Sequence, residues 1–378
     1  MKDETRNQVV ILLVVIINFL FAYKYFARVM PYALMGSIAY STMVGMVYYF
    51  LQKRETKWVE SNMLFWGITF LYVSLHVVFF SYIKVAQLNV DRWSVISSFW
   101  DVAFNGKYPY SAQSHMGNYP GPLPVYFLLS LPFYLIHEVG YLSLSGFILL
   151  AWVLRRYMSH KDSTIALFLL VSSVALFWEI SVRSTIVVNA VLFLAYLRWL
   201  THIDLRKTSY FILSAVVGGL LLSTRSIFAF ALVVYGVFAL KNKVLPFKKL
   251  FWWSSLLLAT FMITFLPFFL FYFYEFTKLN PFFVQSDTLF PFSYVPILFG
   301  VAVIAGLLCK KTPDVFFWTG MVFGAVFSIY AIRLCMIHGP VNAYINSVID
   351  LSYSLFCLPL MLYSLRSDEG KNVFQEAA

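Results

Sequence analysis

The sequence predicts an all-α fold, a polytopic bundle of transmembrane helices that forms a single domain over residues 1–378. Hydrophobic residues make up 61% of the chain and charged residues only 12%, whereas soluble domains carry about 25% charged residues. Non-alternating apolar runs approach the roughly 20 residues that a helix needs to span a bilayer. The basic residues fall in short clusters between these runs, which is typical of topology signals. The net charge of +11 therefore does not indicate binding to nucleic acid.

The apolar runs predict about twelve membrane crossings, plus one re-entrant or interfacial segment. Because the runs do not alternate between apolar and polar residues, they indicate helices rather than the strands of a barrel. The crossings are expected near 9–29, 31–52, 62–83, 140–154, 164–180, 185–201, 209–223, 227–240, 250–274, 294–309, 315–333 and 341–365.

The basic clusters give the expected orientation, because loops rich in Lys and Arg stay in the cytoplasm. These clusters lie in alternate loops, and placing them inside also puts both ends of the chain in the cytoplasm. The apolar segment 121–137 would break this pattern if it crossed. It holds several prolines, so we expect it to lie along the outer interface or to dip into the membrane and return. The clusters lie at 53–57, 155–161, 206–207, 241–249 and 310–311.

Two substantial loops are expected on the outer face, at 86–124 and 275–294. In the first loop, apolar residues at helical spacing predict an amphipathic helix over 93–104 that lies on the membrane. Asp91 precedes this helix, at the end of a transmembrane helix. It is either the N-cap of the amphipathic helix or a carboxylate at the mouth of the bundle that accepts a proton from an acceptor hydroxyl or amine. The second loop mixes aromatic and polar residues and either covers a substrate or simply lies at the interface.

The first outer loop resembles that of the GT-C superfamily, the membrane glycosyltransferases that use polyprenyl-phosphate sugars. Protein O-mannosyltransferases and the aminoarabinose transferases of lipid A belong to it. The resemblance covers about 60–240 and departs from the family in having Arg92 where several branches carry a second carboxylate. It rests on Asp91 before the amphipathic helix, on Asn105-Gly106-Lys107-Tyr108-Pro109-Tyr110, on Tyr119-Pro120-Gly121-Pro122, on Ser181-Val182-Arg183 and on the glycine-containing run that ends at Arg225.

The resemblance implies a glycosyltransferase with its active site on the extracytoplasmic face of the plasma or inner membrane. Asp91 would be the general base, and the acceptor would attack the anomeric carbon with inversion while the lipid phosphate leaves. The expected partners are a polyprenyl-phosphate-sugar donor, a lipid or glycan acceptor and membrane lipids. We expect no cofactor and no metal ligands.

The remaining candidates for substrate binding lie on the same expected face. Arginine suits an anionic lipid phosphate because its guanidinium makes bidentate, charge-assisted hydrogen bonds. Arg225 and Arg333 are the preferred phosphate ligands, against the alternative of structural ion pairs. Asp101 is interpreted as a solvated helix position or a second carboxylate, and His115 as a structural or a catalytic histidine. The full set of expected substrate-binding residues is Arg92, Asp101, Lys107, Tyr110, His115, Arg183, Arg225 and Arg333.

Two acidic residues lie within apolar segments, where a carboxylate needs a partner. Glu179 and Arg183 have the i,i+4 spacing of a helical ion pair. Asp350 lies inside the expected last crossing, and we expect one of the arginines at 183, 225 or 333 to pair with it.

Three other functions are compatible with the sequence. A flippase or transporter of lipid-linked sugars also has many helices and intramembrane charges, but here the polar residues gather toward one face and no repeated halves are evident. A polymerase or ligase of surface polysaccharide usually places its large outer loop later in the chain. A non-enzymatic assembly subunit could retain the same fold.

Overall fold

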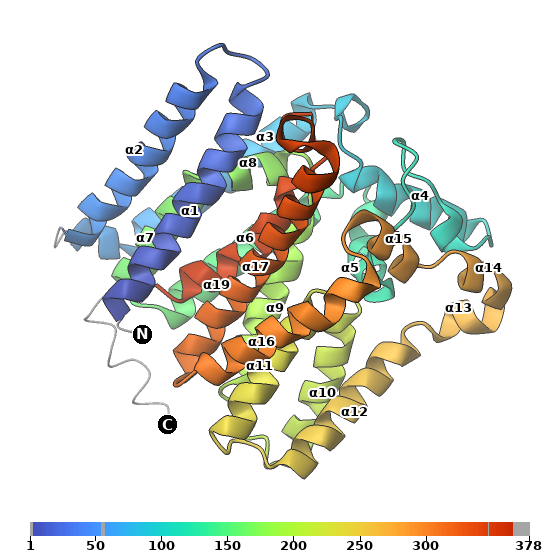
Figure 1. Cartoon of the computed structure of the whole chain (residues 1–378). Coiled ribbons are helices and arrows are strands. Elements are labelled where there is room, and N and C mark those ends of the chain that lie inside the picture. Colours follow the sequence, from blue (N-terminus) through green and yellow to red (C-terminus); the bar gives the residue numbers. More distant parts are fainter. Residues whose placement is uncertain (1–2, 54–56, 347, 366–378) are drawn as a thin grey trace.

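The computed structural model describes residues 3–53, 57–346 and 348–365, without the side chains of 287 and 288, and every regular element in these ranges is helical (Figure 1). The α-helices are α1 (Asp3–Phe26), α2 (Ala33–Lys53), α3 (Asn62–Tyr82), α4 (Arg92–Phe104), α5 (Pro124–Leu135), α6 (Gly140–Tyr157), α7 (His160–Val171), α8 (Val174–Ser181), α9 (Ile186–Leu200), α10 (Thr208–Leu222), α11 (Phe228–Lys241), α12 (Phe247–Ile263), α13 (Leu266–Phe271), α14 (Phe273–Lys278), α15 (Pro281–Thr288), α16 (Val295–Leu308), α17 (Thr312–His338), α18 (Pro340–Tyr344) and α19 (Leu358–Tyr363). Short 3₁₀ helices are η1 (Lys57–Glu60), η2 (Val85–Gln87), η3 (Pro109–Ser111), η4 (Phe292–Tyr294) and η5 (Leu351–Phe356).

Several helices are long and apolar enough to cross a membrane. Within the described ranges, α1, α2, α3 and α17 meet this condition, and the count rises from 4 to 6 if the bent pairs α5–α6 and α7–α8 each form one span. Shorter apolar helices include α9, which packs on α6, α10, which packs on α12, and α11, which packs on α16 and α17. The chain is therefore a multi-pass membrane protein with an all-helical fold.

Three of the predicted crossings are not continuous helices. The run 164–180 is split between α7 and α8, which meet at an angle of 64°. The run 250–274 ends as a regular helix at Ile263 and continues into the short helices α13 and α14. The run 341–365 is wrong as one helix, because its described residues include the separate helices α18, η5 and α19.

The break between α7 and α8 lies inside the bundle, where free backbone groups need partners. Tyr40 of α2 supplies them: its hydroxyl donates to the carbonyl of Ser172 at 2.6 Å and accepts from the amide of Val174 at 2.9 Å. Asn18 of α1 accepts a hydrogen bond from Ser173 at 2.8 Å. The α1–α2 hairpin, which forms one edge of the molecule in Figure 1, therefore stabilises a broken helix in the bundle.

The segment 121–137 forms α5, a helix of 12 residues that turns by 113° into α6. Twelve residues extend about 18 Å, which is shorter than the roughly 30 Å hydrocarbon layer. This helix cannot span a bilayer alone, in agreement with the predicted interfacial or re-entrant segment. It packs on α4, which spans the predicted 93–104, so the predicted amphipathic helix is confirmed as a helix.

The two predicted outer loops meet at one end of the bundle, which we call the α4 end (Figure 1). Tyr108 donates to the carbonyl of Leu279 at 2.6 Å, and Tyr272 donates to the carbonyl of Gly106 at 3.1 Å. A second apolar core, the α4 cluster, fills the space between the loops. Its buried members are Ile96, Phe99, Tyr108, Tyr110, Leu123, Tyr126, Phe127, Val139, Phe265 and Phe276.

Close helix packing fixes α10, the helix that precedes Arg225. A Cβ added at Gly219 would lie 2.5 Å from the carbonyl oxygen of Leu257 in α12, and one at Gly218 would lie 2.5 Å from the Tyr196 hydroxyl in α9. Small residues permit such approaches between membrane helices. The position of Arg225 is therefore set by the contact of α10 with two neighbouring helices.

Candidate functional site

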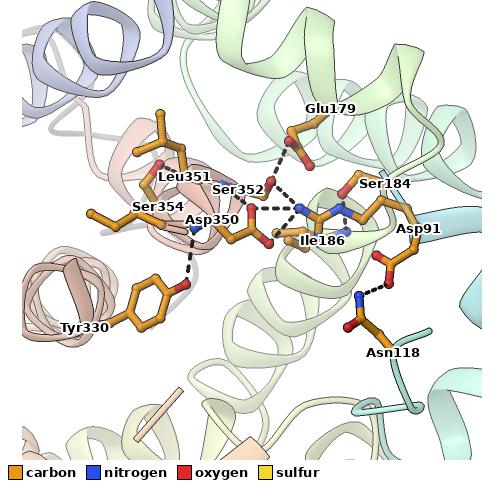
Figure 2. Close-up of polar contacts among 12 residues, drawn as sticks. Asp91, Asn118, Glu179, Ser184, Ile186, Tyr330, Asp350, Leu351, Ser352 and Ser354 are labelled. Carbon is orange, nitrogen blue, oxygen red and sulfur yellow. Dashed lines mark hydrogen bonds and ion pairs between the residues drawn. The ribbon is translucent and has the colours of Figure 1, made fainter. Parts of the chain in front are cut away.

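Asp91 lies at the first turn of α4, at the α4 end of the bundle. It occupies the N-cap position, but its side chain makes no capping hydrogen bond. Instead its Oδ2 accepts from Ser114 Oγ at 3.0 Å and from Asn118 Nδ2 at 2.7 Å (Figure 2). Among the described residues Oδ1 has no hydrogen-bond partner. Hydrogen bonds to Oδ2 thus orient the carboxylate, and Oδ1 is available to accept a hydrogen bond from a bound molecule.

The half-buried side chain of Arg92 pairs with a carboxylate from the end of the chain. Its Nη2 lies 2.7 Å from both carboxylate oxygens of Asp350 and 2.7 Å from Ser352 Oγ. The predicted pairing of Asp350 with an arginine at 183, 225 or 333 is therefore wrong, since the partner is Arg92. This arrangement also gives Arg92 a structural partner in place of the predicted contact with substrate.

Asp350 and Glu179 form one polar centre with Arg92. Glu179 Oε1 accepts from Ser352 Oγ at 2.5 Å, and Figure 2 shows Glu179, Ser352 and Asp350 converging beside Asp91. Burial alone would raise the pKa of Asp350. The charge of Arg92 and hydrogen bonds from Ser352 and Arg92 outweigh burial and hold this pKa below its ordinary value. Asp350 therefore stays ionised at neutral pH.

The predicted i,i+4 pair of Glu179 with Arg183 does not form. Arg183 has a left-handed backbone conformation, with φ of 61°, and pairs with Glu138 at 3.3 Å. Its other donors bind the carbonyls of Ser181, Phe80 and Ile83. Arg183 is 1% exposed, and these contacts join the ends of α3 and α8 to the turn that precedes α6.

A cavity of about 280 Å³ lies between α11, α16 and α17, beneath α15. Its walls are mainly apolar, with a few polar side chains among them. Its lining includes Gly121, Arg225, Ser226, Phe230, Gln285, Leu289, Phe299, Val326, Tyr330 and Tyr353. A long apolar chain with an anionic group fits such a lining, because apolar side chains receive the chain and a cation receives the charge.

Arg225 is the cation of this cavity. Its guanidinium carbon lies 4.9 Å from the ring centroid of Tyr126, and its Nε is buried without a hydrogen-bond partner. No carboxylate pairs with Arg225 in the described ranges. Gly121, also in the lining, lies three residues after Asn118, whose side chain donates to Asp91 at 2.7 Å. The cavity therefore lies close to Asp91, although the two come from distant parts of the chain.

Arg333 lies one turn beyond Tyr330 on α17, near the cavity. It donates to the carbonyl of Leu289 at 3.1 Å and has no carboxylate partner among the described residues. Gln285 of α15 closes the same side, because it donates to the carbonyl of Gly121 at 2.6 Å and accepts from Ser226 Oγ at 2.6 Å. The second outer loop thus covers the cavity.

The other predicted binding residues have different environments. Tyr110 is 1% exposed within the α4 cluster and donates to the carbonyl of Pro122 at 3.2 Å, so it is a core residue. His115 stacks on Trp93 and contacts Ser94 Oγ through Nδ1 at 2.7 Å. The exposed Asp101 accepts from Tyr134 at 2.6 Å, which ties α4 to α5. Lys107 is exposed on the turn after α4.

The structure thus brings Asp91, Arg225 and Arg333 to one end of the bundle and assigns Tyr110 and Arg183 to its packing. Sequence reasoning missed Tyr353 and Gln285, which line the cavity. Neither residue stands out in the sequence, since tyrosines and polar loop residues are common in this chain. In the described part of the chain, no three His, Cys, Asp or Glu side chains gather as a metal site would require.

Comparison with known proteins gives no identification, because no family model, no curated protein and no solved structure matches this chain.

Proposed function

We propose that this protein is a membrane glycosyltransferase that transfers a sugar from a polyprenyl-phosphate donor to a lipid or glycan acceptor. The observation that carries the proposal is the apolar cavity close to the oriented carboxylate of Asp91, with Arg225 in its lining and no carboxylate paired with this arginine in the described part of the chain. A charge placed inside a membrane protein without a partner is costly and is usually functional. The motifs shared with the GT-C superfamily point to the same chemistry.

In the proposed reaction, Asp91 is the general base. An acceptor hydroxyl or amine attacks the anomeric carbon of the donor and gives its proton to Asp91 Oδ1, while Ser114 and Asn118 keep Oδ2 in place. The bond between the anomeric carbon and the phosphate oxygen breaks, and the lipid phosphate leaves with the electron pair. Attack from the face opposite the phosphate inverts the anomeric configuration.

Arg225 and Arg333 hold the leaving phosphate in this reaction. Charge-assisted hydrogen bonds from guanidinium groups to phosphate are about twice as strong as neutral ones. Charge also develops on the phosphate as the bond breaks, so the arginines stabilise the transition state more than the bound donor. The apolar walls of the cavity, such as Phe230, Phe299 and Val326, accept the first isoprene units of the lipid.

We propose that this chemistry takes place on the extracytoplasmic face. Arg6 donates to the carbonyl of Ser364 at 3.0 Å, so the first and last described helices meet at one end of the molecule. Lys241 contacts the carbonyl of Cys309 at 3.3 Å, which brings the basic clusters 241–249 and 310–311 together. Basic clusters favour the cytoplasmic side, which leaves the α4 end for the opposite face.

The proposal is tested with purified protein in liposomes, a radiolabelled polyprenyl-phosphate sugar and an extract of envelope lipids and glycans as acceptors. Wild-type protein should form a labelled product, and Asp91→Asn should abolish this while still binding the lipid. Asp101→Asn is the matched control, because it removes another carboxylate of α4 that is exposed and bonded to Tyr134. Product formation by Asp91→Asn at the wild-type rate would refute the proposed base.

A flippase for lipid-linked sugars is the second candidate, because a buried cation in an apolar cavity also suits a transporter. The same liposomes separate the two functions. Movement of the labelled donor between leaflets without any new glycosidic bond would favour the flippase.

A further inference from the structure

A continuous set of contacts joins Asp91 to the wall of the cavity. Arg92 follows Asp91 in the chain, and its guanidinium binds both oxygens of Asp350 at 2.7 Å. The backbone amide of Asp350 donates to the Tyr330 hydroxyl at 3.2 Å. Tyr330 lines the cavity from α17. Two residues therefore separate the proposed base from a side chain that would touch a lipid in the cavity.

Asp350 reaches the cavity by a second route. Its Oδ1 accepts from the amide of Ser352 at 3.1 Å and so caps η5. This short helix carries Tyr353, whose ring meets that of Tyr330 edge to face at 5.7 Å in the cavity lining. Asp350 therefore supports both tyrosines, Tyr330 through its backbone amide and Tyr353 through its carboxylate at the start of η5, and Arg92 attaches that carboxylate to α4.

Stability alone does not account for this ion pair. A partly buried ion pair contributes little more than well-packed apolar residues would, and this pair also lies beside a third ionised or polar group, Glu179. Its geometry, in contrast, fixes the start of α4 relative to η5, two elements 258 residues apart in sequence. Such a contact is suited to fixing a distance between a base and a bound substrate.

We propose that Arg92 and Asp350 form a positioning pair, which fixes the position of the Asp91 carboxylate relative to the cavity. When an anionic lipid binds in the cavity, the pair also couples that binding to the loop whose side chains hold Asp91. The inference rests on the proposed function and goes beyond it, because it assigns Arg92 to alignment rather than to substrate contact. Neither residue of the pair touches the reacting atoms. The pair acts through Asp91 on one side and through Tyr330 and Tyr353 on the other.

The test compares the wild type with Asp350→Asn, Arg92→Gln and Arg92→Lys. The matched control is Glu138→Gln, which breaks the other partly buried Arg–carboxylate pair at the same end of the bundle. Each protein, in nanodiscs, is measured for binding of a polyprenyl phosphate, for kcat and KM of sugar transfer, and for hydrogen exchange of residues 111–118 with and without that lipid.

We expect Asp350→Asn and Arg92→Gln to bind the lipid within about threefold of the wild type. Their kcat should fall by about 100-fold, the loss typical of a reacting group displaced by roughly 1 Å. The lipid should slow exchange at 111–118 in the wild type and no longer do so in these variants. Arg92→Lys keeps the charge and should recover part of kcat, while Glu138→Gln should lose thermal stability and keep kcat.

Two results would overturn the inference. One is a kcat for Asp350→Asn or Arg92→Gln no lower than that of Glu138→Gln, and the other is unchanged lipid-induced protection at 111–118 in Asp350→Asn. The exchange measurement needs no sugar transfer. If lipid slows exchange in the wild type but no sugar is transferred, the proposed function is refuted and the coupling between the cavity and residues 111–118 stands. If sugar is transferred but kcat does not change when the pair is broken, the positioning role is refuted and the proposed function stands.

Discussion

Two arginines at the same end of the bundle should respond oppositely to the same substitution. Arg183 has carbonyl and carboxylate partners for its guanidinium, whereas Arg225, among the described residues, lies over the ring of Tyr126 and has a buried Nε without a partner. Arg183→Gln leaves Glu138 without its cation and three carbonyls without donors, which should cost about 3–5 kcal/mol of stability. Arg225→Gln removes a charge that nothing neutralises, so stability should stay within about 0.5 kcal/mol or rise.

Lipid binding should show the reverse order. A charge-assisted hydrogen bond contributes about 1.5–3 kcal/mol, and 1.4 kcal/mol corresponds to a factor of ten. Arg225→Gln should therefore weaken binding of a polyprenyl phosphate by roughly 10- to 150-fold, and Arg183→Gln should leave it unchanged. The affinity of Arg225→Lys should lie between those of the wild type and Arg225→Gln, because lysine keeps the charge but cannot make the bidentate hydrogen bonds of a guanidinium.

The assay pairs thermal denaturation in detergent with binding of radiolabelled polyprenyl phosphate in nanodiscs, on the same preparations. A polyprenol without phosphate serves as the ligand control, and its weak binding should not depend on Arg225. The reasoning is refuted if Arg225→Gln destabilises the protein as much as Arg183→Gln does while its affinity for the phosphate is unchanged.

Three further substitutions test the packing and the electrostatics. Tyr40→Phe should cost about 1–3 kcal/mol of stability, because it removes the hydroxyl that binds the backbone at the α7–α8 break. Tyr72→Phe should be neutral, because the Tyr72 hydroxyl is buried without a partner among the described residues. Unfolding in detergent compares the stabilities of the two variants. In Gly219→Ala the added Cβ would lie 2.5 Å from its nearest neighbour, which must move by about 0.9 Å to reach the 3.4 Å of ordinary contact. This substitution should cost about 1–3 kcal/mol of stability. Gly324→Ala meets nothing within 4 Å and should be neutral or stabilising in the same measurement. The pKa of Asp350 is lowered on folding. Its ion pair therefore stabilises the protein above about pH 4, and this stabilisation is lost as the pH falls through the lowered pKa. The melting temperature of Asp350→Asn should for this reason depend less on pH than that of the wild type in this acidic range.

Local patterns predicted the elements that depend on local physics. The helix over 93–104 appears as Arg92–Phe104 and is followed by Gly106 at φ of +68°, because apolar periodicity and a turn residue determine both. The run 341–365 is equally apolar but does not form one helix. Asp350 in its middle caps η5 and pairs with Arg92, so a tertiary contact decides the backbone there.

In the candidate site, too, local features were predictable from the sequence and tertiary contacts were not. Asp91 was recognisable from its place before an amphipathic helix, which is a local feature. The direction of the Arg92 side chain was not, because it depends on a partner 258 residues away. The cavity was also beyond sequence reasoning, since its walls come from α11, α15, α16, α17 and η5, which lie far apart in the sequence.

The charges at the α4 end provide a final argument that this end is functional. Arg92 with Asp350, and Arg183 with Glu138, neutralise one another in pairs. Asp91, Arg225 and Arg333 differ from these pairs: no ion pair joins them to one another or to another charge in the described ranges, and Asp91 accepts hydrogen bonds from the neutral Ser114 and Asn118. Selection for stability alone would pair or remove such charges. A reaction in which a proton is taken at one point and an anion leaves at another requires a carboxylate and a guanidinium that are close but kept apart.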